Sequence, residues 1–451
     1  MQNDFGTGRV WRRIIAQAIP LTLAQLVQLL YNIVDRIYIG HLPGADSTAL
    51  TGIGLTFPIV SLIGAFTSLF ATGGTPLFSI ARGAGEKERA SRILGCVFTL
   101  LALSSLVLTA FCLTFRRPIL YLFGASDASY VYADAYLRIY LLGTPLIMLS
   151  TGLNGFINAQ GFARVGMMTT LIGAALNLLL DPLLIFAFDM GVAGAALATV
   201  ISQAVSCLWV LRFITGRRVP LPLRRAHMGV PAALLKQILS LGTAGFIMQG
   251  TNSLVQVACN TTLQLFGGDL YVGIMTVLNS VRSVLEMPVF GVTNGAQPVL
   301  GFNFGAKKHA RVREGIRFMS FLGAGYTVVT WIVVLLFPLA FIRLFSSDPA
   351  LLAAAPHAMG LYFFGYVFMS FQFAGQCTFQ ALGYAKYAIF FSLLRKAVIV
   401  VPLTLLLPRL GLGVDGVFLA EPISNLLGGT ACFVTMLRRV YIPLGRKEAS
   451  R

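Results

Sequence analysis

The chain repeats itself at a fixed offset of 222 residues. Residues 191–198 read GVAGAALA and residues 413–420 read GVDGVFLA, and the same offset aligns Gly73, Pro76 and Gly143 with Gly295, Pro298 and Gly365. Loops tolerate insertions, yet the offset holds without a slip from about residue 49 to about residue 202. The two halves must therefore share one topology.

The composition indicates a membrane protein. Hydrophobic residues make up 57% of the chain and charged residues 11%, whereas about a quarter of the residues of a soluble domain are charged. A spanning helix needs roughly 20 apolar residues. Such stretches are predicted near residues 14–40, 48–71, 93–115, 134–158, 166–188, 192–214, 234–266, 270–300, 317–341, 357–382, 386–408 and 414–438. Barrel strands would be shorter and would alternate, so the predicted fold is all-α with twelve transmembrane helices.

The repeat predicts how these helices are grouped. Each half holds six spans, an even number, so both repeats begin on the same side of the membrane and are parallel. Parallel repeats build two lobes around a central cleft, an architecture typical of secondary transporters. The predicted parts are an N-terminal six-helix lobe over 1–215, a basic linker over 216–236, a C-terminal lobe over 237–438 and a tail over 439–451.

The net charge of +18 does not indicate a nucleic-acid partner, because the positive residues follow the topology. Of the 34 Lys and Arg, 27 are assigned to the N-terminal tail, the even-numbered loops, their flanks and the C-terminal tail. Four are assigned to the other side (Arg116, Arg117, Arg343 and Arg409) and three to spans (Arg36, Arg138 and Arg282). The positive-inside rule then predicts that both termini are cytoplasmic. The basic linker is expected to fix topology or to contact anionic lipid. The first span is interpreted as a retained helix, since no cleavage site follows it.

No catalytic or metal-binding motif is evident. The six cysteines stand singly in apolar runs and the four histidines are scattered, which argues against a zinc site or histidine catalysis. No phosphate-binding GxxxxGK[ST] loop occurs, and the glycines near Gly83 are interpreted as a basic turn between helices. The chain is therefore predicted to be no enzyme and to carry no cofactor.

Function is expected where the repeat fails, because polar groups inside a membrane are costly. The polar residues without a like counterpart are Asp35 (opposite Val257), Asn177 (Ile399), Asp181 (Leu403), Thr199 (Glu421) and Glu286 (Gly64). Asn177 and Asp181 lie one helical turn apart, and estimates of depth place Asp35 and Thr199 near the same level. These four residues are predicted to form one cation site in the N-terminal lobe.

The chemistry of this site leaves two coupling ions open. Neighbouring desolvated carboxylates resist ionising together, so one of them is expected to hold a proton near neutral pH. The same oxygens suit a hard monovalent cation such as sodium. In the competing interpretation Asp35 pairs with an arginine, and Asp181 only stabilises the kink before Pro182.

Two carboxylates of the second half, Glu286 and Glu421, each allow two interpretations. Glu286 follows Arg282 by four residues, so either Arg282 neutralises it or it forms a substrate or secondary site. Glu421 precedes Pro422 and is interpreted either as a second site for cations or as a satisfied residue at a helix kink.

These residues give the chain a resemblance to the multidrug and toxic compound extrusion (MATE) family over nearly its whole length. It is similar to the bacterial branches with the cation site in the N-terminal lobe. The resemblance rests on Pro20 and Asp35 in the first span, NLLLDP at 177–182, Thr199, NAQGFAR at 158–164, and the paired turns at 73–84 and 295–306.

The resemblance implies an inner-membrane antiporter, acting as a monomer, that exports amphipathic organic cations in exchange for protons or sodium. It also implies that Asp35, Asn177, Asp181 and Thr199 bind the coupling ion and that the first helix bends at Pro20. A flippase for a lipid-linked precursor is the alternative within the same superfamily. A membrane-embedded transferase or hydrolase is disfavoured, since no histidine or cysteine accompanies the acidic residues.

Overall fold

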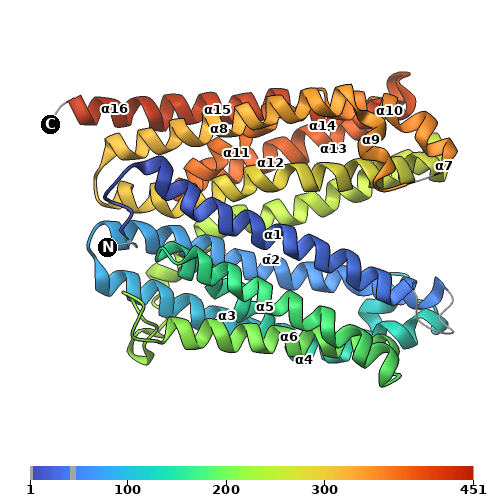
Figure 1. Cartoon of the computed structure of the whole chain (residues 1–451), viewed down its shortest axis with the longest axis horizontal. Helices are drawn as coiled ribbons and strands as arrows, with labels where there is room; N and C mark the ends of the chain where they lie inside the picture. The colour runs from blue at the N-terminus through green and yellow to red at the C-terminus, as the bar shows by residue number, and fades with distance from the viewer. Residues whose placement is uncertain (1–3, 41–46, 347, 450–451) are drawn as a thin grey trace. The chain divides into compact units, whose positions relative to one another are not determined.

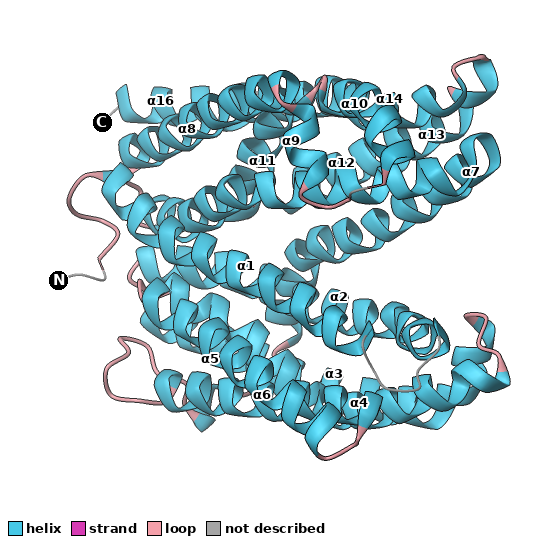
Figure 2. Ribbon diagram, turned by 45° about the vertical axis from the view of Figure 1, so that its right-hand side comes forward, coloured by secondary structure: helices cyan, strands magenta, loops and turns pink. Residues whose placement is uncertain are grey.

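The computed structural model describes residues 4–40, 47–346 and 348–449, and these ranges contain helices and loops but no strand (Figure 2). The description leaves out the side chains at 32, 35–37, 39–40, 47–51 and 447–449. Asp35 is among them, and its backbone lies in a helix.

The chain divides into two compact units. One comprises Met1–Asp4 and Leu23–Gly242, and the other comprises Phe5–Thr22 and Thr243–Arg451. These units differ from the predicted lobes at the beginning of each half. Residues 5–22, predicted for the N-terminal lobe, belong to the second unit, and the start of the seventh span belongs to the first. The beginning of the first helix of each half therefore belongs to the unit that holds the rest of the other half.

The first unit holds the helices of the first half (Figure 1). They are α1 (Val10–Gly40), of which the part from Leu23 belongs here, α2 (Ser47–Gly83), α3 (Lys87–Leu122), α4 (Asp127–Ala159), α5 (Ala163–Pro182), the π-helix η1 (Leu183–Ala187), α6 (Gly191–Ile214) and the short η2 (Arg225–His227). Helix α4 contacts α2, α3, α5 and α6. Its core residue Phe156 packs edge-on against Phe78 of α2, with ring centroids 5.3 Å apart.

The second unit holds the helices of the second half. They are α7 (Ala232–Gly305), of which the part from Thr243 belongs here, α8 (His309–Leu336), α9 (Pro338–Arg343), α10 (Pro349–Phe363), α11 (Tyr366–Ala381), α12 (Ala385–Leu393), η3 (Leu394–Val400), α13 (Val401–Leu406), η4 (Pro408–Leu410), α14 (Gly413–Ser424), η5 (Asn425–Gly429), α15 (Thr430–Met436), η6 (Leu437–Tyr441) and α16 (Ile442–Ala449). Helix α7 is interrupted at Gly268, whose φ of 69° is left-handed and suits glycine.

The helices account for the predicted spans. Within the described ranges, nine helices are long and apolar enough to cross a membrane, or ten if α10 and α11, bent by 44°, form one span. The two segments of α7 on either side of Gly268 coincide with the predicted spans 234–266 and 270–300. The prediction of an all-α integral membrane fold with two repeats is confirmed. The last candidate span runs from Gly413 to Arg446, so it extends into the predicted tail.

Paired glycines explain how each unit accepts a helix beginning from the other half. A Cβ on Gly73 of α2 would lie 2.2 Å from the Ile238 carbonyl oxygen, and one on Gly242 would lie 1.7 Å from that of Leu69. The repeat counterpart of Gly73 is Gly295, where a Cβ would lie 2.7 Å from the Ala18 nitrogen. Only glycine permits such close backbone approach, which gives the repeated glycines a structural reason.

The predicted linker is an ordered part of the first unit. The side chain of Gln160 accepts a hydrogen bond from Leu221 N (3.0 Å) and donates one to Leu221 O (3.3 Å). Thr99 Oγ1 donates to Met228 O at 2.7 Å. Gln160 is fully buried, so these bonds fix the loop on the helices as well as satisfying its backbone.

Candidate functional site

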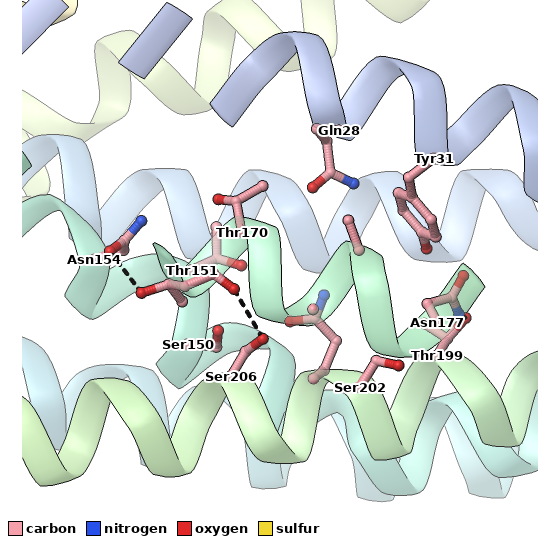
Figure 3. A pocket seen from close by; sticks show the side chains of 14 residues that line it. Gln28, Tyr31, Ser150, Thr151, Asn154, Thr170, Asn177, Thr199, Ser202 and Ser206 are labelled. Atoms are coloured by element: carbon pink, nitrogen blue, oxygen red, sulfur yellow. Dashed lines mark hydrogen bonds between the residues drawn. The ribbon is translucent and has the colours of Figure 1, made fainter. Parts of the chain in front are cut away.

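A polar cavity of about 110 Å³ lies inside the first unit, among α1, α4, α5 and α6 (Figure 3). Its lining residues are Gln28, Tyr31, Ser150, Thr151, Asn154, Thr169, Thr170, Gly173, Ala174, Asn177, Thr199, Ser202, Gln203 and Ser206. Hydroxyls and amides dominate this lining, and none of its described residues is Lys or Arg. These described side chains offer oxygen atoms to a small cation.

Asn177, Asp181 and Thr199 are brought together at one end of this cavity. The orientation of the Asn177 amide that satisfies both of its polar atoms donates to Asp181 Oδ2 at 2.9 Å and accepts from Thr199 N at 3.2 Å. In the reverse orientation, Asn177 Nδ2 lies 3.4 Å from Thr199 Oγ1. We prefer the first, because the reverse leaves the amide nitrogen facing the Thr199 N–H, which is a donor, and the amide oxygen facing the Asp181 carboxylate.

Local sequence explains why these groups meet. Asn177 and Asp181 stand at i and i+4 on α5, so they lie on one face, and both are buried. Pro182 then ends the α-helix, and the chain continues as the π-helix Leu183–Ala187. Proline cannot donate a backbone hydrogen bond, and π-turns are frequent where helices carry functional groups. The kink therefore follows directly on the buried carboxylate.

The predicted site is thus described for three of its four residues. Asp35 continues helix α1 one turn after Tyr31, but its side chain lies outside the described residues. From the same helix, Gln28 and Tyr31 project toward α5 and α6 (Figure 3).

A polar stripe on α6 begins at Thr199 and continues through Ser202 and Ser206, and the last two residues were not predicted as part of the site. Their i, i+3, i+7 spacing is the signal that identifies this stripe. Ser202 is 1% exposed, and its hydroxyl has no partner among the described residues.

The second unit contains a buried charge cluster centred on Glu421. Glu421 Oε1 accepts hydrogen bonds from Arg282 (2.8 Å), Arg395 (3.2 Å) and Lys396 (2.9 Å). Arg282 also bonds Glu286, four residues later on the same helix, and its Nη1 donates to Tyr362 Oη at 3.0 Å. We name these five charged residues, Arg282, Glu286, Arg395, Lys396 and Glu421, the C-unit cluster.

Two positive residues of the C-unit cluster lie elsewhere than predicted. Arg395 and Lys396 were counted with the cytoplasmic residues, but they lie in the buried π-helix η3, within the candidate span Ala385–Leu410. Each is 9% exposed. The cluster therefore contains three cations against two carboxylates. The contact between Arg282 and Glu286 agrees with the interpretation in which the arginine neutralises the acid, and Glu421 is satisfied beside its helix kink.

The profile of the MatE family matches residues 20–183 and 246–406, one segment in each half. The chain belongs to the MatE family. The first matched segment includes Asn177 and Asp181, whereas Thr199 and Glu421 lie beyond the matched segments. The family assignment confirms the resemblance inferred from the repeat and its polar residues.

Curated relatives of this MatE protein match it almost from end to end. The multidrug export protein MepA of Staphylococcus haemolyticus (strain JCSC1435) is 26% identical over 440 residues, which cover 97% of this chain and 94% of its own. MepA of Staphylococcus aureus (strain N315) is 24% identical over 97% of this chain and 95% of its own.

Solved structures share the fold. A crystal structure of MATE in complex with MaL6 superposes with a TM-score of 0.91 at 22% identity, covering 98% of each chain. An outward-facing multidrug resistance MATE family transporter of the MOP superfamily gives the same values. At 22% identity, the similarity to these two structures shows that the fold is shared and nothing further.

Proposed function

We propose that this MatE protein exports amphipathic organic cations from bacteria in exchange for an inward coupling ion, either H⁺ or Na⁺. The observation that carries the proposal is the end-to-end similarity to proteins called multidrug export protein MepA. A fold assembled from apolar helices, with no nucleotide-binding loop in its sequence, is in keeping with a secondary transporter and not with an enzyme.

The coupling ion is proposed to bind at Asp35, Asn177, Asp181 and Thr199. The support for this assignment is the contact of Asn177 with Asp181 and Thr199 beside an oxygen-lined cavity. Position 35 follows Tyr31 and Gln28 by four and seven residues, so the helical period puts all three positions on one face of α1. We expect Asp35 to supply the second carboxylate.

Binding of the ion is proposed to act through α1. A proton or sodium ion neutralises the carboxylates, which changes the free energy of the surrounding helices. Pro20 lies in α1 two residues before its passage from the second unit to the first. Because proline removes a helical hydrogen bond at that point, α1 is proposed to bend there as the substrate is released.

We also propose that the protein is a monomer of the inner membrane, surrounded by lipid, with both termini in the cytoplasm. The support for the orientation is the excess of Lys and Arg in the termini and even-numbered loops.

The test is dye efflux from proteoliposomes under an imposed proton gradient and, separately, an imposed sodium gradient. One gradient is expected to drive efflux in the parent protein, and the replacements Asp35→Asn and Asp181→Asn are each expected to abolish it. Efflux that persists in both variants would contradict the proposed site. Binding of a lipid-linked sugar without binding of cationic dyes would favour the flippase instead.

A further inference from the structure

The two units place a cavity at equivalent positions of the repeat. The second cavity, of about 270 Å³, lies wholly within the second unit and is lined in part by the C-unit cluster. Four lining positions of the two cavities correspond at the offset of 222 residues, namely Thr151 with Phe373, Gly173 with Arg395, Ala174 with Lys396, and Thr199 with Glu421.

The polarity of the two cavities is opposite. In the first unit, Gly173 and Ala174 are small and neutral, and the charged group described next to the cavity is the carboxylate of Asp181. In the second unit, Arg395 and Lys396 stand at the same two positions. With Arg282 they outnumber the carboxylates Glu286 and Glu421, so one positive charge is in excess among the described residues.

A buried charge without a counter-charge is costly, and proteins balance such charges by pairing. We propose that the cavity of the second unit binds an organic carboxylate, whose negative charge completes the C-unit cluster. Arginine matches a carboxylate through two parallel hydrogen bonds, and lysine adds a compact charge beside it.

The walls of the cavity favour an organic anion over an inorganic one. At about 30 Å³ for each water, the cavity has room for several atoms beyond a carboxylate group. Met248, Phe290 and Phe373 form apolar lining, and the two phenylalanine rings have centroids 4.6 Å apart. An aromatic or aliphatic body can pack on these side chains while its carboxylate contacts the cluster.

This inference goes beyond the proposed export of cations. It assigns a negatively charged group to the second unit, whereas the coupling ion is assigned to the first. A zwitterion with a carboxylate is a substrate class that the C-unit cluster accepts and that a purely acidic cavity would repel. Binding is tested without any gradient, so the result is independent of the efflux experiment.

The test is isothermal titration calorimetry of the full chain in nanodiscs with 1-naphthoate, and with 1-naphthamide as the uncharged probe of similar shape. The parent protein is expected to bind 1-naphthoate at least about tenfold more tightly than 1-naphthamide, as is typical when a charged hydrogen-bonded pair forms in a buried site. Equal affinities, or no binding of 1-naphthoate, would overturn the proposal. Binding of chloride without any heat from 1-naphthoate would contradict the proposal that the anion is an organic one.

Variants localise the effect. Lys396→Gln is expected to remove the preference for 1-naphthoate, whereas Lys396→Arg retains it. The matched control is Lys386→Gln, an exposed lysine ten residues earlier in the same candidate span, which is expected to bind as the parent does. A preference that survives Lys396→Gln would place the anion elsewhere and contradict the assignment. If this variant does not fold, the comparison of the two probes on the parent protein still decides the question.

Discussion

At the scale of single residues, Asp181 is the most direct test of coupling. Its carboxylate is buried and accepts a hydrogen bond from Asn177 at 2.9 Å. Asp181→Asn keeps the size of the side chain but can neither release a proton nor balance a bound cation. We expect gradient-driven dye efflux from proteoliposomes to fall at least about tenfold, with the amount of folded protein unchanged.

The matched control for this prediction is Asp189→Asn. Asp189 is exposed and has a left-handed φ of 51°, which asparagine tolerates. The variant is expected to transport as the parent does. If Asp181→Asn and Asp189→Asn both transported normally, the carboxylate of Asp181 would not be the coupling group.

Glu421 is predicted to hold the second unit together. Its carboxylate accepts from Arg282, Arg395 and Lys396. Glu421→Gln leaves three cations facing one another around a neutral amide, and breaking a buried pair in this way costs about 3–5 kcal/mol. Thermal unfolding in detergent should therefore begin at a lower temperature. Adding Lys396→Met to Glu421→Gln should recover part of the loss, because it removes one of the repelling charges.

An unchanged unfolding temperature in Glu421→Gln would show that the cluster is not balanced by this carboxylate. Asp415→Asn, which changes a partly exposed carboxylate near the start of the same helix, serves as the control and is expected to cost little.

The polar residues of the first unit could be predicted from the sequence, but those of the C-unit cluster only in part. Asn177, Asp181 and Thr199 could be predicted to meet, because helical spacing and span order determine their faces and levels. Arg395 and Lys396 were missed, because they were counted with the cytoplasmic positive residues although the predicted span 386–408 contains both. Comparing them with Gly173 and Ala174 at the repeat offset was the available signal. The contact of Arg282 with Glu421 joins residues 139 apart and depends on tertiary packing.

At the scale of helices, Gly242 is predicted to control how the start of α7 packs in the first unit. A Cβ at this position would lie 1.7 Å from the Leu69 carbonyl oxygen, so Gly242→Ala forces the two backbones apart at a cost of about 1–3 kcal/mol. We expect a lower unfolding temperature.

Gly250→Ala in the same helix is the control for Gly242→Ala. Nothing lies within 4 Å of a Cβ at position 250, so alanine should stabilise the helix by about 0.5–1 kcal/mol. Equal effects of the two replacements would contradict the close approach of α2 and α7.

Pro20 gives a prediction about helix α1. Pro20→Ala restores a donor for the carbonyl of Ala16 and removes the steric clash of the ring, so the helix should resist bending. Hydrogen exchange of the amides next to position 20 should slow, and efflux should decrease. Pro118→Ala, at an exposed proline inside α3, should leave efflux unchanged. Normal efflux with slowed exchange at position 20 would separate helix bending from transport.

The number and order of helices could be predicted from the sequence. That the starts of α1 and α7 belong to the opposite units could not. Hydropathy locates apolar stretches, and the gap between the predicted spans seven and eight falls at Gly268, where α7 is interrupted. Which unit receives residues 5–22 depends instead on side-chain packing, such as that of Val10 and Ile14 in the core with Ile316. Hydropathy does not encode such long-range contacts, and the same holds for the π-helices after Pro182 and Pro422.

At the scale of the whole molecule, the repeat supplies the architecture and its exceptions supply the chemistry. Glycine stands at both Gly73 and Gly295 because a helix from the other half packs closely against each of them, at Ile238 and at Ala18. Position 199 and its counterpart 421 line a cavity in each unit, but one carries a hydroxyl and the other a carboxylate held by three cations. The two units thus hold cavities whose corresponding lining positions differ in charge.

The orientation in the membrane leads to the last prediction. The excess of Lys and Arg predicts that residue 218 lies in the cytoplasm and residue 410 outside. All six native cysteines are buried, and Cys259, which lines the second cavity, can be replaced by serine. On that background, Arg218→Cys should react with a membrane-impermeant maleimide only in inside-out vesicles, and Leu410→Cys only in right-side-out vesicles. Both positions are exposed, so access depends on the side of the membrane. The reverse labelling pattern would show that the orientation is opposite to the predicted one. Labelling of both residues from one side would contradict an odd number of spans between them.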